Sequence, residues 1–391
     1  MSLVWLLAGE HSGDVLGARL MAALKAARPD LTFAGVGGPR MAAEGLESLF
    51  PMQELAVMGL LEVLPRVLRL RRLMALAEAD IRACRPGVLV TIDSPGFALR
   101  LLRRLRGSGI RRVHYVAPQV WAWREGRVRE FPGLWDELLC LLPFEEEFFA
   151  RHDLPVRFVG HPVLESGADA GDAARFRARH ALPPESRVLV LMPGSRRSEA
   201  GRLLPVFGAT LEHLAPRIPA LVPVVPTAAA VAPVVRAATA SWPVRPLIVT
   251  DIAEKHDAYA AAAAALTKSG TSTLELALAG VPMAVTYRVN PLTAIIARRL
   301  IRVPHVAMVN LLAGRQVVPE LLQEDCRPER LAATLARLIE DEAAATDQRA
   351  AFRAVMAQLA APVGRPSAAA AAEVLAVLDR SDREEAAQAR P

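Results

Sequence analysis

The sequence predicts an α/β protein with two doubly wound domains, each built on a mainly parallel sheet. Short apolar runs alternate with longer helical patterns along the first half of the chain, and the alternation restarts after a small, polar stretch at residues 166–172. Several of the apolar runs end in glycine-containing turns. With 391 residues the chain also exceeds what one hydrophobic core usually organises, so two domains are expected.

The first domain is expected to cover residues 1–165. Its strands are short apolar runs that follow one another at the spacing of βα units. The predicted strands are residues 3–7, 32–36, 88–92, 113–116, 138–142 and 157–159.

The second domain is expected to cover residues 166–345, followed by C-terminal helices at 346–391. Its predicted strands are residues 187–192, 221–225, 247–250, 264–267 and 283–286. The alanine run at 260–265 is predicted to be helix interior, because alanine is the strongest helix former. The charged tail after residue 380 is expected to be frayed.

The composition is that of an ordinary soluble globular protein, with 52% hydrophobic and 23% charged residues. A net charge of +6 favours anionic partners: nucleic acid, an anionic lipid surface or a phosphorylated substrate. The three cysteines form no C-x-x-C pair, so neither a disulfide framework nor a zinc site is predicted, and a reducing cytoplasm fits best. The start lacks the basic residues of a secretory signal, and prolines interrupt the longest uncharged stretch, so no transmembrane helix is expected.

The turn after the first strand reads AGEHSGD and contains Glu10 and Ser12. A tight turn at the carboxyl edge of a parallel sheet can face a ligand. Alternatively, the glycines only permit the turn, and Ser12 or Asp14 caps the next helix. The string is not G-x-G-x-x-G, and the second strand ends in Gly37-Gly38 without a ribose-binding acid, which disfavours NAD.

Asp93 follows the third strand in the string IDSPGF. A carboxylate at this position points towards the crevice at the sheet edge, where a general base takes a proton from an acceptor hydroxyl. Ser94 before Pro95 is also a helix start with proline at the first helical position. Capping is therefore the favoured role of Ser94, and both interpretations stay open for Asp93.

Gln119 and two tryptophans follow the fourth strand in the string HYVAPQVWAWR. Indole faces at the rim of a cleft suit sugar rings or acyl chains. Burial in a domain core is the commoner fate of such tryptophans, so the functional interpretation is the minority one.

The first candidate diphosphate turn is PGSR, which contains Ser195 and Arg196 and follows a strand of the second domain. It offers backbone N–H groups, a hydroxyl and a guanidinium at one spot, and pyrophosphate is the natural ligand. The same string is also an ordinary turn.

The second candidate turn is SGTSTLE, which follows another strand and begins a helix. Its anion-binding residues would be Gly270, Thr271 and Ser272, with Glu275 one turn later accepting from a ribose diol. The competing interpretation is a capping box between Ser272 and Glu275, which needs no ligand.

Asn310 and Arg315 lie in an otherwise apolar segment at residues 304–315. A buried amide must find partners, and a ligand is one of them. Nearby backbone is the usual partner.

A basic amphipathic helix is predicted at residues 60–74, with apolar residues on one face and arginines on the other. Such a helix can lie in an anionic membrane surface, although a helix packed on its own sheet gives the same pattern more often. The candidate membrane-contact residues are Val57, Met58, Leu60, Leu61, Leu64, Arg66, Arg69 and Arg72.

Taken together, these strings resemble the lipid-A-disaccharide synthase family over residues 8–361. The strings that carry the resemblance are, in order, AGEHSGDVLGA, VGGPRMAAEG, ELAVMGLLEVL, IDSPGF, HYVAPQVWAWR, LPFEEEFF, FVGHP, PGSR, SGTSTLE and NLLAGRQVVPELLQ. So many ordered matches make a chance resemblance very improbable.

The resemblance implies a GT-B fold, in which two Rossmann-like domains face a central cleft, and a reaction without metal or cofactor. In agreement, the sequence lacks the D-x-D pair that holds a metal-nucleotide complex in the other glycosyltransferase fold. The implied donor is UDP-2,3-diacylglucosamine and the implied acceptor is 2,3-diacylglucosamine 1-phosphate. A β-1,6 linkage forms and UDP leaves.

The implied mechanism is a single inverting displacement, in which Asp93 removes the proton of the acceptor 6-hydroxyl. Arg196 and the helix start at residues 270–272 offset the charge of the departing diphosphate. Glu275 holds the ribose, and Asn310 matches a family residue required at the cleft. The further motif positions matched at the cleft are Glu10, Ser12, Gln119 and Arg315.

The acyl chains of both substrates give the segment around residues 57–74 a reason to be apolar, so the resemblance favours peripheral association with the cytoplasmic surface of the inner membrane. No nucleic-acid partner is implied. A homodimer is a candidate assembly, and the tail is expected to cross back to the first domain or to a partner chain. His11 and Lys268 stand where small residues are more usual in the family, and they receive no role.

Two alternatives stay open. Another GT-B enzyme of the same nucleotide class, a UDP-N-acetylglucosamine transferase or a UDP-sugar epimerase, explains the second half of the chain but not IDSPGF or VWAW. A nucleic-acid or anionic-lipid binding protein without catalysis explains the positive charge, and it predicts a solvent-facing stripe of arginines and no need for Asp93.

Overall fold

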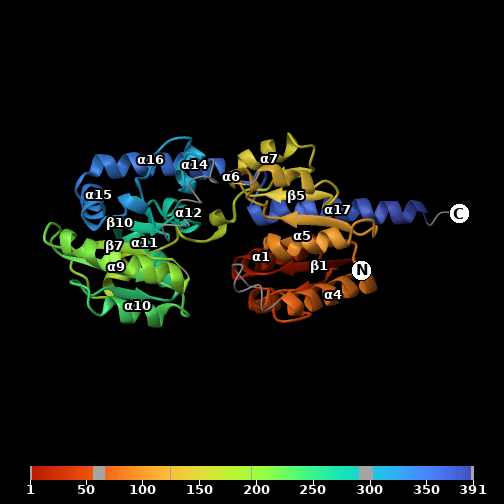
Figure 1. Cartoon of the computed structure of the whole chain (residues 1–391), viewed down its shortest axis with the longest axis horizontal. Helices are drawn as coiled ribbons and strands as arrows, with labels where there is room; N and C mark the ends of the chain where they lie inside the picture. Colours follow the sequence, from red (N-terminus) through yellow and green to blue (C-terminus); the bar gives the residue numbers. More distant parts are fainter. Residues whose placement is uncertain (1, 56–66, 124, 195, 290–302, 389–391) are drawn as a thin grey trace. The chain divides into compact units, whose positions relative to one another are not determined.

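The computed structural model describes residues 2–55, 67–123, 125–194, 196–289 and 303–388. The chain forms two compact units (Figure 1). The first consists of residues 1–162 and 359–391, and the second of residues 163–358.

The first unit is built on a six-stranded parallel sheet with the strand order β2-β1-β3-β4-β5-β6. Its strands are β1 (Leu3–Ala8), β2 (Thr32–Val36), β3 (Val88–Ile92), β4 (Arg111–Tyr115), β5 (Glu137–Cys140) and β6 (Val156–Phe158). Its α-helices are α1 (His11–Ala27), α2 (Pro39–Ala43), α4 (Val67–Cys84), α5 (Pro95–Arg104), α6 (Val120–Trp123), α7 (Pro143–Ala150) and α17 (Pro366–Gln388). Short 3₁₀ turns are η1 (Met52–Glu54), η3 (Glu125–Glu130) and η4 (Pro162–Glu165), the last at the division between the units.

The second unit repeats this construction with a sheet in the order β12-β11-β10-β7-β8-β9. Its strands are β7 (Arg187–Met192), β8 (Leu221–Pro226), β9 (Leu247–Val249), β10 (Ala262–Lys268), β11 (Met283–Tyr287) and β12 (Glu320–Leu322). Its helices are α8 (Ala173–Arg179), α9 (Arg197–Leu214), α10 (Ala232–Thr239), α11 (Ile252–Ala261), α12 (Ser272–Leu278), α14 (Met308–Ala313), η5 (Gln323–Asp325), α15 (Pro328–Glu340) and α16 (Glu342–Gln358).

Every predicted strand is present, and no strand end differs by more than two residues from the expected one. The prediction missed β12, a three-residue edge strand that pairs with β11 through Glu320, Leu321 and Leu322. So short a strand has too few residues to show an apolar pattern of its own.

The prediction of a helix interior across the alanine run was wrong. Helix α11 ends at Ala261 and β10 begins at Ala262. Ala264 and Ala265 pair with Leu189 and Val190 of β7 in the middle of the sheet. Burial in this parallel ladder overrides the helix propensity of alanine, which amounts to only a few tenths of a kcal/mol per residue.

The C-terminal helix α17, dark blue in Figure 1, belongs to the first unit, where it packs against α1 and against β3, β4 and β5. Val374, Val377 and Leu378 are fully buried in the core of that unit. The helix continues to Gln388.

Asp14 caps a helix other than its own. Its fully buried carboxylate accepts hydrogen bonds from the backbone N–H groups of Gly38, Arg40 and Met41, at 2.9, 3.1 and 3.0 Å. These groups begin α2 and have no partner inside the helix. Asp14 therefore joins α1 to the turn after β2.

Helix α4 packs on its own unit through Leu73, Met74, Ala77 and Ile81, which are all buried. None of the helices among the described residues has the length and apolar composition that crossing a bilayer requires.

Gly35 of β2 offers a stability test. Its φ is +131°, and a Cβ atom there would lie 1.9 Å from the carbonyl oxygen of Leu6. Gly45 has a φ of +88° with nothing within 4 Å of the added atom. We expect Gly45→Ala to cost about 1 kcal/mol from backbone strain alone, and Gly35→Ala to cost about 4 kcal/mol or more because β1 and β2 must separate. Denaturant unfolding followed by circular dichroism measures both, and equal losses would refute the steric explanation.

Candidate functional site

The strand order of the first unit reverses at β1, because β2 lies on one side of it and β3 on the other. At such a point the connecting helices leave towards opposite faces of the sheet, so a crevice opens at the carboxyl ends of the two central strands. The turns after β1 and β3 meet here. A Cβ atom on Gly9 would lie 2.4 Å from Ser94 Oγ, so only glycine permits this approach.

Glu10 and Ser12 lie at this edge of the sheet. Glu10 occupies the N-cap position of α1, and Ser12 is exposed in the first turn of the helix. Neither side chain caps α1 among the described residues, and Asp14 is engaged with α2. The alternative interpretation, in which Ser12 or Asp14 caps α1, is therefore wrong.

The backbone around Asp93 is strained. Asp93 and Ser94 have φ values of +51° and +49°, and Val116, which follows β4 next in the sheet, has a φ of +80°. Left-handed backbone is unusual for residues other than glycine, and a β-branched residue there is an outlier. Strain of this kind costs of order 1–3 kcal/mol for each residue and clusters at functional sites.

The Asp93 carboxyl is half-buried, and its backbone N–H donates to the Tyr115 carbonyl at 2.8 Å. Burial raises the pKa of this carboxyl, and a hydrogen bond from the Ser94 backbone opposes part of the rise. A higher pKa makes the carboxylate a stronger base than an exposed aspartate.

Ser94 holds the N-cap position of α5, but its hydroxyl caps no backbone N–H among the described residues. The favoured capping role of this hydroxyl was therefore wrong. The backbone of Ser94 is left-handed, whereas an N-cap residue normally has an extended backbone. The Ser94 carbonyl still accepts from Phe97 and Ala98.

The tryptophans of α6 are not in the core. Trp121 is half-buried, donates from Nε1 to Glu145 Oε1 at 3.0 Å and meets Phe144 edge-on at 4.8 Å between ring centroids. Trp123 is 42% exposed, and Gln119, just before α6, is exposed. Burial raises the pKa of Glu145 to about 7, against the effect of its hydrogen bonds from Trp121, Leu142 and Leu141. The sequence favoured burial of Trp121 and Trp123 in a domain core, and this prediction was wrong.

His114 is a buried neutral group behind this edge. Its Nδ1 lies 2.8 Å from Thr91 Oγ1, and its ring stacks on Trp135 with centroids 5.7 Å apart. Desolvation lowers the pKa of His114 to about 4.

The second unit has the same kind of reversal at β7, between β8 and β10. PGSR follows β7 and SGTST follows β10, and these strands pair up to Met192 and Thr267. The two candidate turns are therefore neighbours at the carboxyl edge. Ser195 lies outside the described residues.

Arg196 and Lys268 share one carboxylate at this edge. Arg196, the exposed N-cap of α9, has Nη1 3.6 Å from Glu199 Oε1. Lys268 Nζ donates to the same oxygen at 2.9 Å. The side chain of Glu199 is buried, with 9% of its surface exposed.

The SGTST turn does not form the capping box. Thr271 is the exposed N-cap of α12, without a side-chain cap among the residues described. Ser272 Oγ lies 3.1 Å from Thr267 Oγ1. Glu275 Oε2 accepts from Lys255 Nζ at 2.9 Å and Tyr259 Oη at 3.3 Å.

Asn310 is fully buried and its amide is used inside the unit. Nδ2 donates to the Val318 carbonyl at 2.9 Å and to Glu320 Oε1 at 2.7 Å, and Oδ1 accepts from the backbone of Val317 and Val318. The Glu320 carboxylate also accepts a hydrogen bond from the backbone N–H of Val306. The carbonyl of Val306 in turn accepts a hydrogen bond of 2.8 Å from the Ser269 hydroxyl. Asn310 thus supports the SGTST turn through Glu320.

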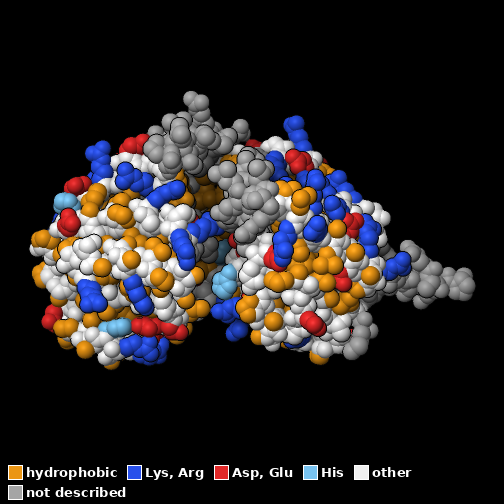
Figure 2. Space-filling view, turned by 60° about the horizontal axis from the view of Figure 1, so that its bottom comes forward, with side chains coloured by type: hydrophobic (Ala, Val, Ile, Leu, Met, Phe, Trp, Pro, Cys, Tyr) orange, Lys and Arg blue, Asp and Glu red, His pale blue; other side chains and the backbone are white. Residues whose placement is uncertain are grey.

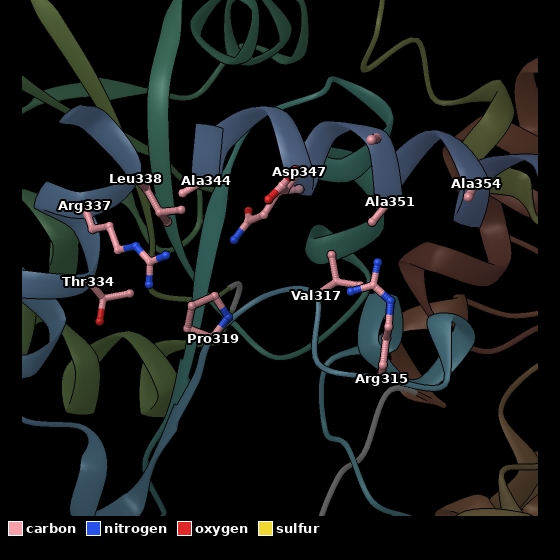
Figure 3. A pocket seen from close by; sticks show the side chains of 12 residues that line it. Arg315, Val317, Pro319, Thr334, Arg337, Leu338, Ala344, Asp347, Ala351 and Ala354 are labelled. Atoms are coloured by element: carbon pink, nitrogen blue, oxygen red, sulfur yellow. The ribbon is translucent and has the colours of Figure 1, made fainter. Parts of the chain in front are cut away.

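Arg315 lies elsewhere in the second unit. It lines a cavity of about 710 Å³ with Val317, Pro319, Arg337 and Gln348 (Figure 3). Gln348 bonds to the backbone of Met283, the first residue of β11, and Pro319 precedes β12. The cavity is therefore at the amino-terminal edge of these strands, and the structure does not bring Arg315 to the candidate diphosphate turns.

The candidate membrane residues are only partly described. Val57, Met58, Leu60, Leu61, Leu64 and Arg66 lie outside the described residues. Arg69 and Arg72 are exposed on α4, and Arg69 pairs with Glu54. Leu68 beside them is 71% exposed, although it was expected on the same face as Met74, which is buried.

Sequence reasoning missed Glu199, Lys255 and Tyr259 as partners of the candidate residues. The spacing of three between Arg196 and Glu199 on one helix is a signal that could have found the first pair. The partners of Glu275 come from α11 and carry no local signal. No group of three or more His, Cys, Asp or Glu residues in the described part of the chain is arranged to hold a metal ion.

A family model described as lipid-A-disaccharide synthetase matches residues 4–374. A lipid-A-disaccharide synthase of Granulibacter bethesdensis is 63% identical over 387 residues, covering 96% of this chain and 98% of the relative. One from Gluconobacter oxydans is 62% identical over 377 residues, covering 96% and 91%.

Solved structures are similar in fold. A UDP-GlcNAc 2-epimerase from Neisseria meningitidis bound to UDP-GlcNAc has a TM-score of 0.62 at 12% identity, over 97% of this chain and all of that one. The calicheamicin glycosyltransferase CalG4 has a TM-score of 0.59 at 18% identity, over 97% and 99%. At these identities the likeness shows the two-domain GT-B fold alone.

The neutral state of buried His114 predicts acid sensitivity. The unfolded histidine binds a proton near pH 6.5 and the folded one only near pH 4, so stability falls as pH falls through this window. Between pH 7 and pH 5 the free energy of unfolding of the wild type should fall by roughly 2 kcal/mol because of this histidine. A His114→Gln variant should not show this loss. Denaturant unfolding at both pH values measures the difference, with His152→Gln on the surface as control; parallel pH profiles would contradict the assignment.

Proposed function

The chain belongs to the lipid-A-disaccharide synthase family and is a glycosyltransferase that forms the lipid A disaccharide, and from this premise we propose its substrates and mechanism. The donor is UDP-2,3-diacylglucosamine, and the acceptor is 2,3-diacylglucosamine 1-phosphate. The observation that carries the mechanism is the Asp93 carboxyl, half-buried on a strained turn at the strand-order reversal of the first unit.

Asp93 acts as general base. Its raised pKa strengthens it as a proton acceptor, and its left-handed backbone fixes the direction of the side chain. The acceptor 6-hydroxyl oxygen attacks the anomeric carbon of the donor, the proton moves to the Asp93 carboxylate, and the bond to UDP breaks with inversion. Glu10, Ser12 and Gln119 lie along the same carboxyl edge and contact the acceptor.

The second unit binds UDP between its two neighbouring turns. Ser195 and Arg196 on one turn, and Gly270, Thr271 and Ser272 on the other, bind the diphosphate and offset its growing charge as it leaves. Glu275 accepts from the ribose through Oε1, because Lys255 and Tyr259 both bond to Oε2. Asn310 positions the SGTST turn through Glu320.

The protein associates peripherally with the cytoplasmic surface of the inner membrane through the first unit. Leu68, Arg69 and Arg72 support this role, because an exposed leucine beside arginines suits an anionic lipid surface. Figure 2 shows basic side chains among exposed hydrophobic atoms on the visible face of this unit, at the right.

Asp93→Asn should separate binding from chemistry. Asparagine tolerates left-handed backbone as well as aspartate does, so the turn is retained. We expect turnover of the two acylated substrates to fall by about 10²–10⁴-fold, the usual contribution of a general base, with an unchanged dissociation constant for UDP. Mass spectrometry of the disaccharide and calorimetry with UDP measure the two quantities, and wild-type turnover in the variant would exclude Asp93 as the base.

Leu68→Gln should weaken binding to vesicles that contain anionic phospholipid. Loss of one inserted leucine, worth about 1.5–3 kcal/mol, predicts binding that is weaker by about 10- to 100-fold. Val363→Gln is the matched control, since Val363 is 79% exposed in the same unit but outside α4. Co-sedimentation compares the variants, and equal binding by all three proteins would rule out contact through Leu68.

A further inference from the structure

Lys268, the last residue of β10, lies against both candidate diphosphate turns. A Cβ atom on Gly194 would be 3.1 Å from Lys268 Cδ, and one on Gly270 would be 3.6 Å from Cε and 3.7 Å from Nζ. The φ values of Gly194 and Gly270 are +112° and +154°, which side chains rarely adopt. The lysine chain therefore runs between two glycine turns that approach it closely.

The ammonium group is well placed to bind an anion. Its side chain is 19% exposed, so its charge is screened less than a surface lysine's. An ammonium group has three N–H donors, and the bond to Glu199 Oε1 uses one of them. No other hydrogen bond of Nζ occurs among the described residues.

Glu199 holds the cationic side chains of Lys268 and Arg196 close together but cannot neutralise both charges. Lys268 and Arg196 both approach its Oε1, so two positive charges face one negative charge. Glu199 Oε2 is buried without a hydrogen-bond partner in the described part of the chain. A buried carboxylate with an unused oxygen gains little for itself, which suggests that its main effect is to fix the Lys268 side chain.

We propose that Lys268 is a diphosphate-binding residue of the donor site, held between the two glycine turns by Glu199. It donates one of its remaining N–H groups to a phosphate oxygen while the bond to Glu199 is retained. This inference rests on the proposed UDP donor and adds to it a cation that the motifs did not assign.

The test compares the affinities of UDP and uridine, because only UDP carries the diphosphate. Calorimetry is done on the full-length wild type, Lys268→Met, Lys268→Arg and the control Lys25→Met, which removes a lysine paired with Glu44 in the first unit. Lys268→Met should weaken UDP binding about 10- to 100-fold, as expected for loss of a charge-assisted hydrogen bond. Uridine binding should change less than about twofold, and Lys268→Arg should retain most of the UDP affinity because it keeps the charge.

Each outcome decides a separate point. If Lys268→Met binds UDP as the wild type does, or weakens UDP and uridine by the same factor, Lys268 does not bind the diphosphate and the donor proposal stands. If Lys25→Met lowers UDP affinity as much as Lys268→Met, the effect is one of net charge and the inference fails. If the wild type itself does not bind UDP, the proposed donor fails.

Discussion

The reversal of strand order at β1 and at β7 is the constraint on which both candidate sites depend. In a parallel sheet each crossover helix must lie on one face, and strands added on opposite sides of a central strand send their helices to opposite faces. The turns after the two central strands are then not covered by either helix layer. In the first unit these turns carry Glu10 and Asp93, and in the second they carry Arg196 and Gly270.

Within the first unit, the site depends on unfavourable conformations that the surrounding fold maintains. Asp93, Ser94 and Val116 hold left-handed backbone at the ends of two adjacent strands. The contact of Gly9 with Ser94 and the hydrogen bond from Asp93 to the Tyr115 carbonyl oppose relaxation of this turn. The turn therefore holds the Asp93 carboxyl in place, as the proposed role of a preorganised general base requires.

Within the second unit, the site depends on paired charges. Glu199 binds Lys268 and approaches Arg196, while Glu275 binds Lys255 and Tyr259. Each acid is kept close to a cation, so the edge of the sheet stays positive without leaving a buried charge uncompensated. The family assignment and the two relatives at 62–63% identity, both lipid-A-disaccharide synthases, favour the disaccharide-forming reaction over epimerisation.

The sequence by itself determined the parallel strands, the division into two halves and the turns at which candidate residues stand, because buried apolar runs and glycine-containing turns are local signals. It also carried the motifs that indicate the family. Only the tertiary structure decided which partners those residues have. Asp14 caps α2 rather than α1, Glu275 pairs with Lys255 instead of capping its own helix, and the alanines after Ala261 form a strand. These outcomes depend on groups that are distant in sequence and are brought together by sheet pairing, whose burial energy exceeds local preferences of a few tenths of a kcal/mol per residue.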